Sequence, residues 1–105
     1  MNLFLRKPGT NRFGSKFSDR EVEAVWQKGQ VIPGENPSFY RKDACGAIMY
    51  RYHYGKQVNN GWEIDHIKPS SKGGTDDLSN LQPMQWENNR QKGDNYPNYE
   101  CALTA

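Results

Sequence analysis

Residues 61–94 read GWEIDHIKPSSKGGTDDLSNLQPMQWENNRQKGD, and this stretch holds the most informative pattern of the chain. An Asp-His pair, Asp65 and His66, is followed by Asn80 and Asn89. The oxygens of Asp65 and Asn89 are the ligands that a hard cation such as Mg²⁺ or Mn²⁺ prefers. Imidazole titrates near neutrality, so His66 is the candidate general base. The pattern therefore indicates hydrolysis of a phosphodiester with one divalent cation.

The same stretch resembles the HNH nuclease family, whose ββα-metal motif runs through DHI-x-P, a Gly-Gly turn, NLQ and a final N-x-x-K-G-D on a helix. The resemblance covers residues 61–94 closely and RKDACGA, residues 41–47, more loosely. It implies an α+β fold in which a β-hairpin packs on a C-terminal helix. It also implies that Asn80 supports catalysis, because the middle residue of the motif fixes the loop and the histidine through hydrogen bonds in this family.

Two departures from the family pattern define a variant. Many members hold a structural zinc with four cysteines, and the corresponding positions here are Lys42, Cys45, Gln85 and Asn88. Only one of the four could bind zinc, so we expect no structural zinc. The final motif position is Asn89 instead of histidine, which resembles the HNN branch that includes the HNH domains of CRISPR effector nucleases. An amide oxygen suits Mg²⁺ better than an imidazole does.

Two helices are predicted from local signals. Ser18 and Glu21 form a capping box, which predicts an additional N-terminal helix that runs to about Lys28. Residues 85–92 form a second predicted helix, which Gly93 ends.

The strands are predicted from β-forming residue types. Residues 47–54 and 62–67 are read as the two strands of a hairpin, and residues 81–84 as a short extended segment. We also expect a bend or bulge near Asp65 and His66, so that the two side chains can serve different parts of the site.

Length and charge suggest two parts, a basic N-terminal arm at residues 1–17 and a single nuclease domain at residues 18–105, with the catalytic motif at 61–94. The chain has 105 residues, enough for one small core. Residues 1–16 contain four basic residues and no acidic one: Arg6, Lys7, Arg12 and Lys16. Such an arm can contact phosphates, and disordered tails have the same composition, so both interpretations stay open.

The chain lacks the roughly 20 consecutive apolar residues that a membrane span needs. The apolar run at the N-terminus is too short for a signal peptide, so we expect a soluble cytoplasmic protein. In that setting Cys45 and Cys101 are expected to be free thiols, with a disulfide between them as the alternative.

Several reactive residues outside the motif positions are assigned structural roles. Asp76 and Asp77 lie beside the Gly-Gly turn and are read as turn and cap residues. His53 lies among tyrosines and is read as a packed or surface histidine. The predicted core around the hairpin and second helix consists of Trp62, Leu81, Met84 and Trp86.

The favoured interpretation is an HNH endonuclease that cleaves double-stranded DNA with one Mg²⁺ or Mn²⁺ ion. Four basic residues are the candidates for contact with phosphates, with a solvated surface charge as the alternative for each: Lys68, Lys72, Arg90 and Lys92. The alternatives are a non-catalytic DNA-binding module of a larger phage or restriction machine, and a toxin that cleaves RNA or DNA. We expect a monomer or weak homodimer, with a place in a larger nuclease or packaging complex as the alternative.

Overall fold

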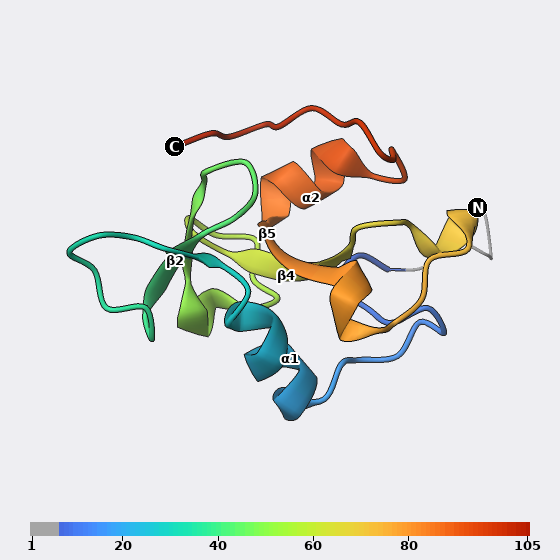
Figure 1. Cartoon of the computed structure of the whole chain (residues 1–105), viewed down its shortest axis with the longest axis horizontal. Helices are drawn as coiled ribbons and strands as arrows, with labels where there is room; N and C mark the ends of the chain where they lie inside the picture. Colours follow the sequence, from blue (N-terminus) through green and yellow to red (C-terminus); the bar gives the residue numbers. More distant parts are fainter. Residues whose placement is uncertain (1–6) are drawn as a thin grey trace.

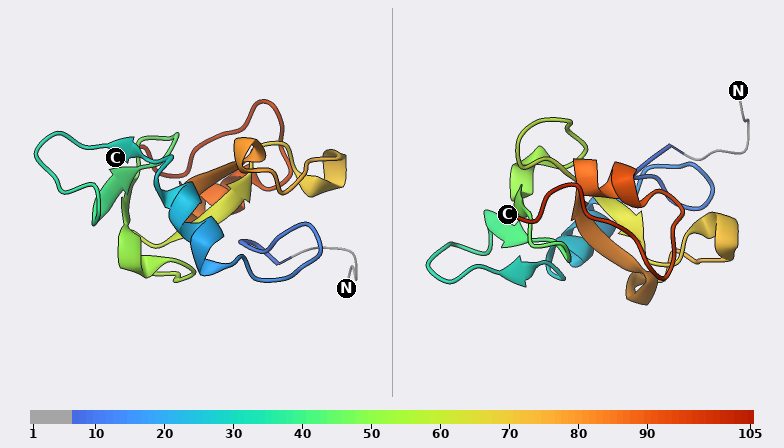
Figure 2. Two further views of the ribbon diagram at one scale, coloured as in Figure 1. Left: turned by 60° about the horizontal axis from the view of Figure 1, so that its bottom comes forward. Right: turned by 90° about the horizontal axis from the view of Figure 1, so that it is seen from above.

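The computed structural model describes residues 7–105 as an α+β protein in which a pair of strands lies between two helices (Figure 1). Strands β4 (Trp62–His66) and β5 (Leu81–Gln85) pair antiparallel. Helix α2 (Trp86–Lys92) follows β5 directly, and helix α1 (Asp19–Trp26) lies on the opposite face of the strand pair. Figure 2 shows α1 in front of the pair in one view and α2 in front of it in the other. This ββα unit agrees with the predicted fold.

A second sheet stands at the other end of the molecule. Its strands are β1 (Gln30–Val31), β2 (Tyr40–Lys42) and β3 (Ile48–Tyr50), all antiparallel and in the order β1-β2-β3. Short 3-10 helices occupy three connections: η1 (Arg51–His53), η2 (Ser70–Lys72) and η3 (Leu78–Asn80).

The predicted hairpin between residues 47–54 and 62–67 is wrong. β3 pairs with β2, and β4 pairs with β5, which the chain reaches only after a long loop. The extended run after residue 47 ends at Tyr50 because η1 begins at the next residue. The two predicted strands meet at an isolated bridge between Tyr54 and Trp62 and at a hydrogen bond from the Trp62 ring to the Arg51 carbonyl, without forming a ladder. Both runs have β-forming sequences, but the residues of a strand do not by themselves determine which other strand it pairs with.

β4 is a regular strand, so the bend or bulge expected near Asp65 and His66 is absent. Its register with β5 runs from Trp62 opposite Gln85 to His66 opposite Leu81 without an extra residue. A regular strand is sufficient because neighbouring side chains already point to opposite faces. Asp65 faces α2, and His66 faces the side of α1. Because helices cover both faces, all residues of β4 are buried.

The signals that predicted the two helices are confirmed. The Ser18 hydroxyl accepts a hydrogen bond from the Glu21 amide at 3.1 Å, and the Glu21 carboxylate accepts one from the Ser18 amide at 2.9 Å. α1 ends at Trp26, slightly before the predicted end. α2 ends at Lys92, and the capping residue Gly93 has a φ of 52°, which suits glycine. Within residues 7–105, no helix has the length and apolar character needed to cross a bilayer.

The hydrophobic core fills the space between α1 and the β4–β5 pair. The rings of Trp26 and Trp62 pack with centroids 5.2 Å apart. Trp62, Leu81 and Met84 are buried as predicted, whereas Trp86 is only half-buried. The buried cluster comprises Phe17, Val25, Trp26, Met49, Trp62, Ile64 and Leu81.

A buried carboxylate, that of Asp43, joins the segment after β2 to the start of α2. One oxygen accepts hydrogen bonds from the amides of Cys45 and Ala47, both at 2.9 Å. The other accepts from the Gln85 amide and the Asn88 side chain, both at 3.0 Å. These are the two segments in which the zinc-binding cysteines of the related pattern would fall. Asp43 therefore joins these two segments by hydrogen bonds, whereas a zinc ion would join them by coordination.

The expectation of two free thiols is wrong, because Cys45 and Cys101 form a disulfide. The C-terminal segment runs back over α2 toward the three-stranded sheet (Figure 1). There the backbone of Leu103 exchanges two hydrogen bonds with the side chain of Asn88, at 2.7 and 2.8 Å.

Removing the disulfide should lower the free energy of unfolding. Cys45 and Cys101 are 56 residues apart, and the loop-closure entropy for a loop of this size corresponds to about 4 kcal/mol. We expect the Cys101→Ser variant to unfold at a clearly lower urea concentration than the oxidised protein. Adding a reductant should lower the midpoint of the oxidised protein toward that of the variant. A midpoint that neither change moves would contradict the disulfide.

Candidate active site

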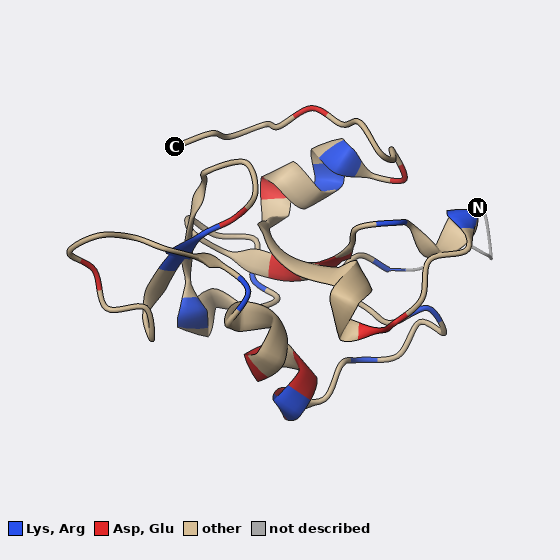
Figure 3. Cartoon of the chain, in the orientation of Figure 1, with Lys and Arg blue, Asp and Glu red and all other residues tan. Residues whose placement is uncertain are grey.

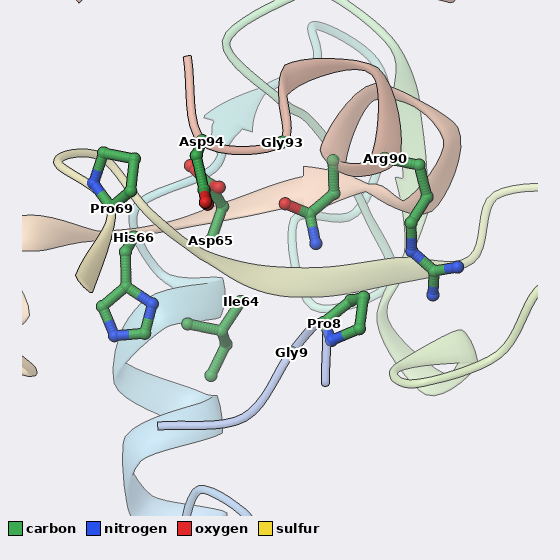
Figure 4. Close-up of a pocket in the computed structure, with 10 residues that line it drawn as sticks. Pro8, Gly9, Ile64, Asp65, His66, Pro69, Arg90, Gly93 and Asp94 are labelled. Carbon is green, nitrogen blue, oxygen red and sulfur yellow. The ribbon is translucent and has the colours of Figure 1, made fainter. Parts of the chain in front are cut away.

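A cavity of about 270 Å³ lies beside the end of β4 (Figure 4). Three of the four predicted motif residues, Asp65, His66 and Asn89, line it. The other lining residues come from the N-terminal arm, β4, the loop after it and the end of α2: Pro8, Gly9, Ile64, Pro69, Arg90, Gly93 and Asp94. The fold therefore brings together residues from both ends of the motif.

Asp65 presents a buried carboxylate to this cavity. One oxygen lies 3.3 Å from the Lys92 ammonium, and the other accepts a hydrogen bond from the Gln82 amide at 2.9 Å. Burial raises the pKa of the Asp65 carboxyl, while the Lys92 charge and the Gln82 hydrogen bond oppose this rise. A carboxylate has about four lone-pair sites, so both oxygens can still bind a cation.

The side-chain amide of Asn89 is oriented by Glu63. Its nitrogen donates to one Glu63 oxygen at 2.9 Å, and Arg90 donates to the other at 2.7 Å. An ionised carboxylate only accepts hydrogen bonds, so the amide nitrogen must face Glu63 and the amide oxygen is left for another ligand. Figure 3 shows the acidic positions on β4 and the basic positions at the end of α2.

Glu63 was not predicted as a site residue. The signal that could have found it is its spacing from Asp65, since residues two apart on a strand share one face. Glu63 is only 5% exposed, so its buried carboxylate needs the partners that α2 supplies.

His66 is almost completely buried, with 1% of its surface exposed. Its Nε2 atom lies 2.7 Å from an Asp76 oxygen. The ring of Phe17 packs nearby, with centroids 6.1 Å apart. Nδ1 is buried and has no hydrogen-bond partner among the described residues. Figure 4 shows Nδ1 on the side of the ring that faces the other pocket residues.

The pairing with His66 corrects the reading of Asp76 as a turn residue. Its neighbour Asp77 does behave as a turn residue, since its carboxylate accepts from the Thr75 hydroxyl at 3.0 Å. The two acidic residues are adjacent in sequence and similar in type, so only the three-dimensional path of the loop distinguishes them.

Asn80 lies outside the cavity and holds the loop that follows His66. Its oxygen accepts from the Lys68 amide at 2.9 Å, and its nitrogen donates to the carbonyls of Lys68 and Thr75 at 3.0 and 2.8 Å. The same loop requires glycine at Gly74, because a Cβ there would lie 1.7 Å from the Lys68 carbonyl oxygen. The structure thus places Asn80 in a supporting position.

The four basic residues expected to contact phosphates differ in their exposure. Lys68 and Lys72 are exposed on the loop after β4. The Arg90 side chain is 37% exposed and pairs with Glu63 at the rim of the cavity. Lys92 differs from the expectation, because it is 1% exposed and donates to the His66 carbonyl at 2.9 Å. Its ammonium compensates the buried charge of Asp65 instead of facing solvent.

The N-terminal arm packs against the site. Pro8 and Gly9 line the cavity, and the Arg12 amide donates to both Asp76 oxygens at 3.0 and 3.3 Å. Phe17 belongs to the core cluster. Arg6, which was counted in the basic arm, lies outside the described residues.

The residues of the cavity fit a hard cation with an incomplete protein shell. Residues 7–105 contain no group of three or more His, Cys, Asp or Glu side chains that could hold an ion. Mg²⁺ is commonly bound by only one or two carboxylates, with waters and substrate oxygens as its other ligands. Asp65 and Asn89 offer a carboxylate oxygen and an available amide oxygen in one cavity, and these donors suit Mg²⁺ or Mn²⁺.

Replacing Lys92 should lower the stability of the folded protein. Lys92→Ala leaves Asp65 without its buried counter-charge, and losing one partner of such a pair costs about 3–5 kcal/mol. We expect this loss in urea unfolding, whereas Lys68→Ala, at an exposed position, should change stability by less than about 0.5 kcal/mol. If Lys92→Ala kept full stability, the ammonium would not be the counter-charge that Asp65 requires.

Residues 53–95 match the family model described as HNH endonuclease. Neither a curated protein nor a solved structure matches the chain significantly. The matched segment includes β4, the loop held by Asn80, β5 and α2, which together form the ββα unit around the cavity. Proteins of this family are typically nucleases that use a divalent metal. Residues 53–95 are therefore similar to the HNH endonuclease domain.

Proposed function

We propose that this protein is a metal-dependent endonuclease that hydrolyses phosphodiester bonds of DNA. One observation carries the proposal: a single cavity is lined by Asp65, His66 and Asn89, and the buried Nδ1 of His66 has no hydrogen-bond partner among residues 7–105. A buried polar atom without a partner is rare in proteins and calls for an explanation. The proposed role of His66 as a general base that binds a water molecule explains why Nδ1 has no protein partner.

His66 is the proposed general base. Nδ1 takes a proton from a water molecule while the water oxygen attacks phosphorus in line with the leaving oxygen. A bond forms between the water oxygen and phosphorus, and the bond to the 3′ oxygen breaks. The products carry a 5′-phosphate and, after the leaving oxygen is protonated by solvent, a 3′-hydroxyl. A positioned base contributes about 10²–10⁴ in rate, or about 3–5 kcal/mol.

Asp65 and Asn89 would hold the divalent cation, Mg²⁺ or Mn²⁺. When bound, such a cation stabilises negative charge on the phosphoryl oxygens. The surrounding residues keep the two ligands oriented: Lys92 and Gln82 hold the Asp65 carboxylate, and Glu63 holds the Asn89 amide. This orientation supports the proposal because ligands fixed before binding lose little conformational freedom on binding.

The exposed basic residues near the cavity are proposed to bind the DNA backbone. Lys68 and Lys72 follow His66 on one loop, and Arg90 lies at the rim. Contacts with phosphate position a nucleic acid without reading its sequence. The proposal is therefore cleavage with little base specificity from these residues, on double-stranded DNA.

A non-catalytic DNA-binding module is the second candidate function. The observation that favours it is the closure of the site, since His66 is only 1% exposed and residues of the arm line the cavity. Such a module would retain DNA in a salt-dependent way and leave it uncut with every divalent metal tested. Nicking of a supercoiled plasmid distinguishes the two candidates.

Replacing His66 should abolish nicking while leaving metal binding intact. His66→Ala removes the base, so we expect the rate of plasmid nicking with Mg²⁺ or Mn²⁺ to fall by about 10²–10⁴. The matched control is His53→Ala, which removes the other histidine of the chain. The His53 ring bonds the Asn59 carbonyl outside the cavity, so this variant should cut like the wild type. Equal cutting by the two variants would eliminate His66 as the base.

Replacing both proposed ligands should remove the metal itself. For the double variant Asp65→Asn/Asn89→Ala, we expect loss of Mn²⁺ binding in electron paramagnetic resonance titrations and nicking no faster than for His66→Ala. Circular dichroism checks that the double variant is folded. If it is not folded, the single variant Asp65→Asn, which preserves side-chain size, takes its place in the test. Asn95→Ala, on the exposed segment after α2, is the control that should bind Mn²⁺ normally. Unchanged Mn²⁺ affinity in the folded double variant would refute these ligands.

A further inference from the structure

We propose that Asp76 is a positioning residue for His66: its carboxylate holds the hydrogen on Nε2, so that the lone pair of Nδ1 faces the cavity. This inference rests on the proposed function, in which His66 is the base. It assigns to Asp76 a role that the motif pattern does not contain. The test below includes a measurement that does not depend on DNA cleavage.

The geometry of the pair supports this role. Asp76 lies on the loop between β4 and β5, and its oxygen approaches His66 Nε2 to 2.7 Å. The carboxylate is also held from the other side, because the Arg12 amide donates to both of its oxygens. The Asp76 side chain is 23% exposed, whereas that of His66 is 1% exposed. The carboxylate thus reaches from the surface to the edge of a buried ring.

The chemistry of the two groups determines which nitrogen carries the hydrogen. An ionised carboxylate can only accept, so a neutral His66 ring must carry its hydrogen on Nε2. Nδ1 is then the nitrogen with a lone pair, and it is also the one that has no partner in the described part of the chain. The same carboxylate stabilises the positive ring that forms when Nδ1 accepts a proton. Orientation and charge compensation therefore act in the same direction.

The bonds of Asp76 point to His66 rather than to its own loop. Within residues 7–105, the hydrogen bonds of its side chain go to His66 and to the backbone of Arg12. The neighbouring Asp77 carboxylate bonds Thr75, two residues away, and so serves the turn. Asp77 is therefore a matched control of the same residue type, one position along the chain.

The kinetic test compares Asp76→Ala, Asp76→Glu and Asp77→Ala in plasmid nicking, after thermal unfolding shows that each variant is folded. For Asp76→Ala we expect kcat to fall by about 10- to 10³-fold with an unchanged KM, because DNA binding does not involve Asp76. Asp76→Glu restores a carboxylate and should recover part of the rate. Asp77→Ala should cut like the wild type. Equal kcat values for Asp76→Ala and Asp77→Ala would overturn the proposal.

The spectroscopic test detects the hydrogen on His66 directly. The chain has two histidines, so ¹⁵N spectra of the imidazole rings at alkaline pH contain two sets of signals, and His53→Ala assigns them. We expect wild-type His66 to show a single tautomer with the hydrogen on Nε2, and Asp76→Ala to show a mixture or the other tautomer. The same tautomer in wild type and Asp76→Ala would refute the positioning role.

These two measurements separate failure of the inference from failure of the proposed nuclease activity. If the wild type bound DNA and did not cut it, the nuclease proposal would fail, while the ¹⁵N spectra would still show whether Asp76 selects the tautomer. If the wild type cut DNA and the tautomer did not depend on Asp76, the nuclease proposal would stand and the inference would fail. Mn²⁺ binding should be equal in wild type and Asp76→Ala, since neither Asp65 nor Asn89 contacts Asp76.

Discussion

Four hydrogen bonds to the buried carboxylate of Asp43 are the constraint on which the position of α2 depends. They fasten the first turn of α2 to the segment after β2. An unpaired buried charge is costly, so the carboxylate tolerates little movement of its four donors. Because the start of α2 is fixed, Asn89 and Lys92 lie on the same side of β4.

The central strand β4 divides the chemistry of the site between its two faces. Glu63 and Asp65 face α2, which supplies a cation or an amide to each of them. His66 faces the opposite side, where Phe17 and Asp76 surround its ring. The buried polar groups of β4 are thus compensated, with the exception of one nitrogen of His66. That exception is the atom at which the proposed reaction begins.

The working site extends beyond the segment that matches the family. Residues 53–95 contain the candidate ligands and base, but the partners that orient them include residues outside this range. The Arg12 amide holds Asp76, and Phe17 packs against His66. The disulfide and the Asn88–Leu103 hydrogen bonds fasten the C-terminal segment over α2. Both ends of the described chain therefore stabilise a motif that lies between them.

Local signals in the sequence determined the features that depend on neighbouring residues. The capping box at Ser18 started α1, Gly93 ended α2, and the residue types at Asp65, His66 and Asn89 indicated a metal and a base. Contacts between distant segments decided the rest. Strand partners, the disulfide, the burial of Lys92 and the pairing of Asp76 with His66 all join residues that are near in space but separated along the chain. A sequence pattern states which groups are present, whereas only the packed chain determines which of them meet, because register and burial depend on the whole fold.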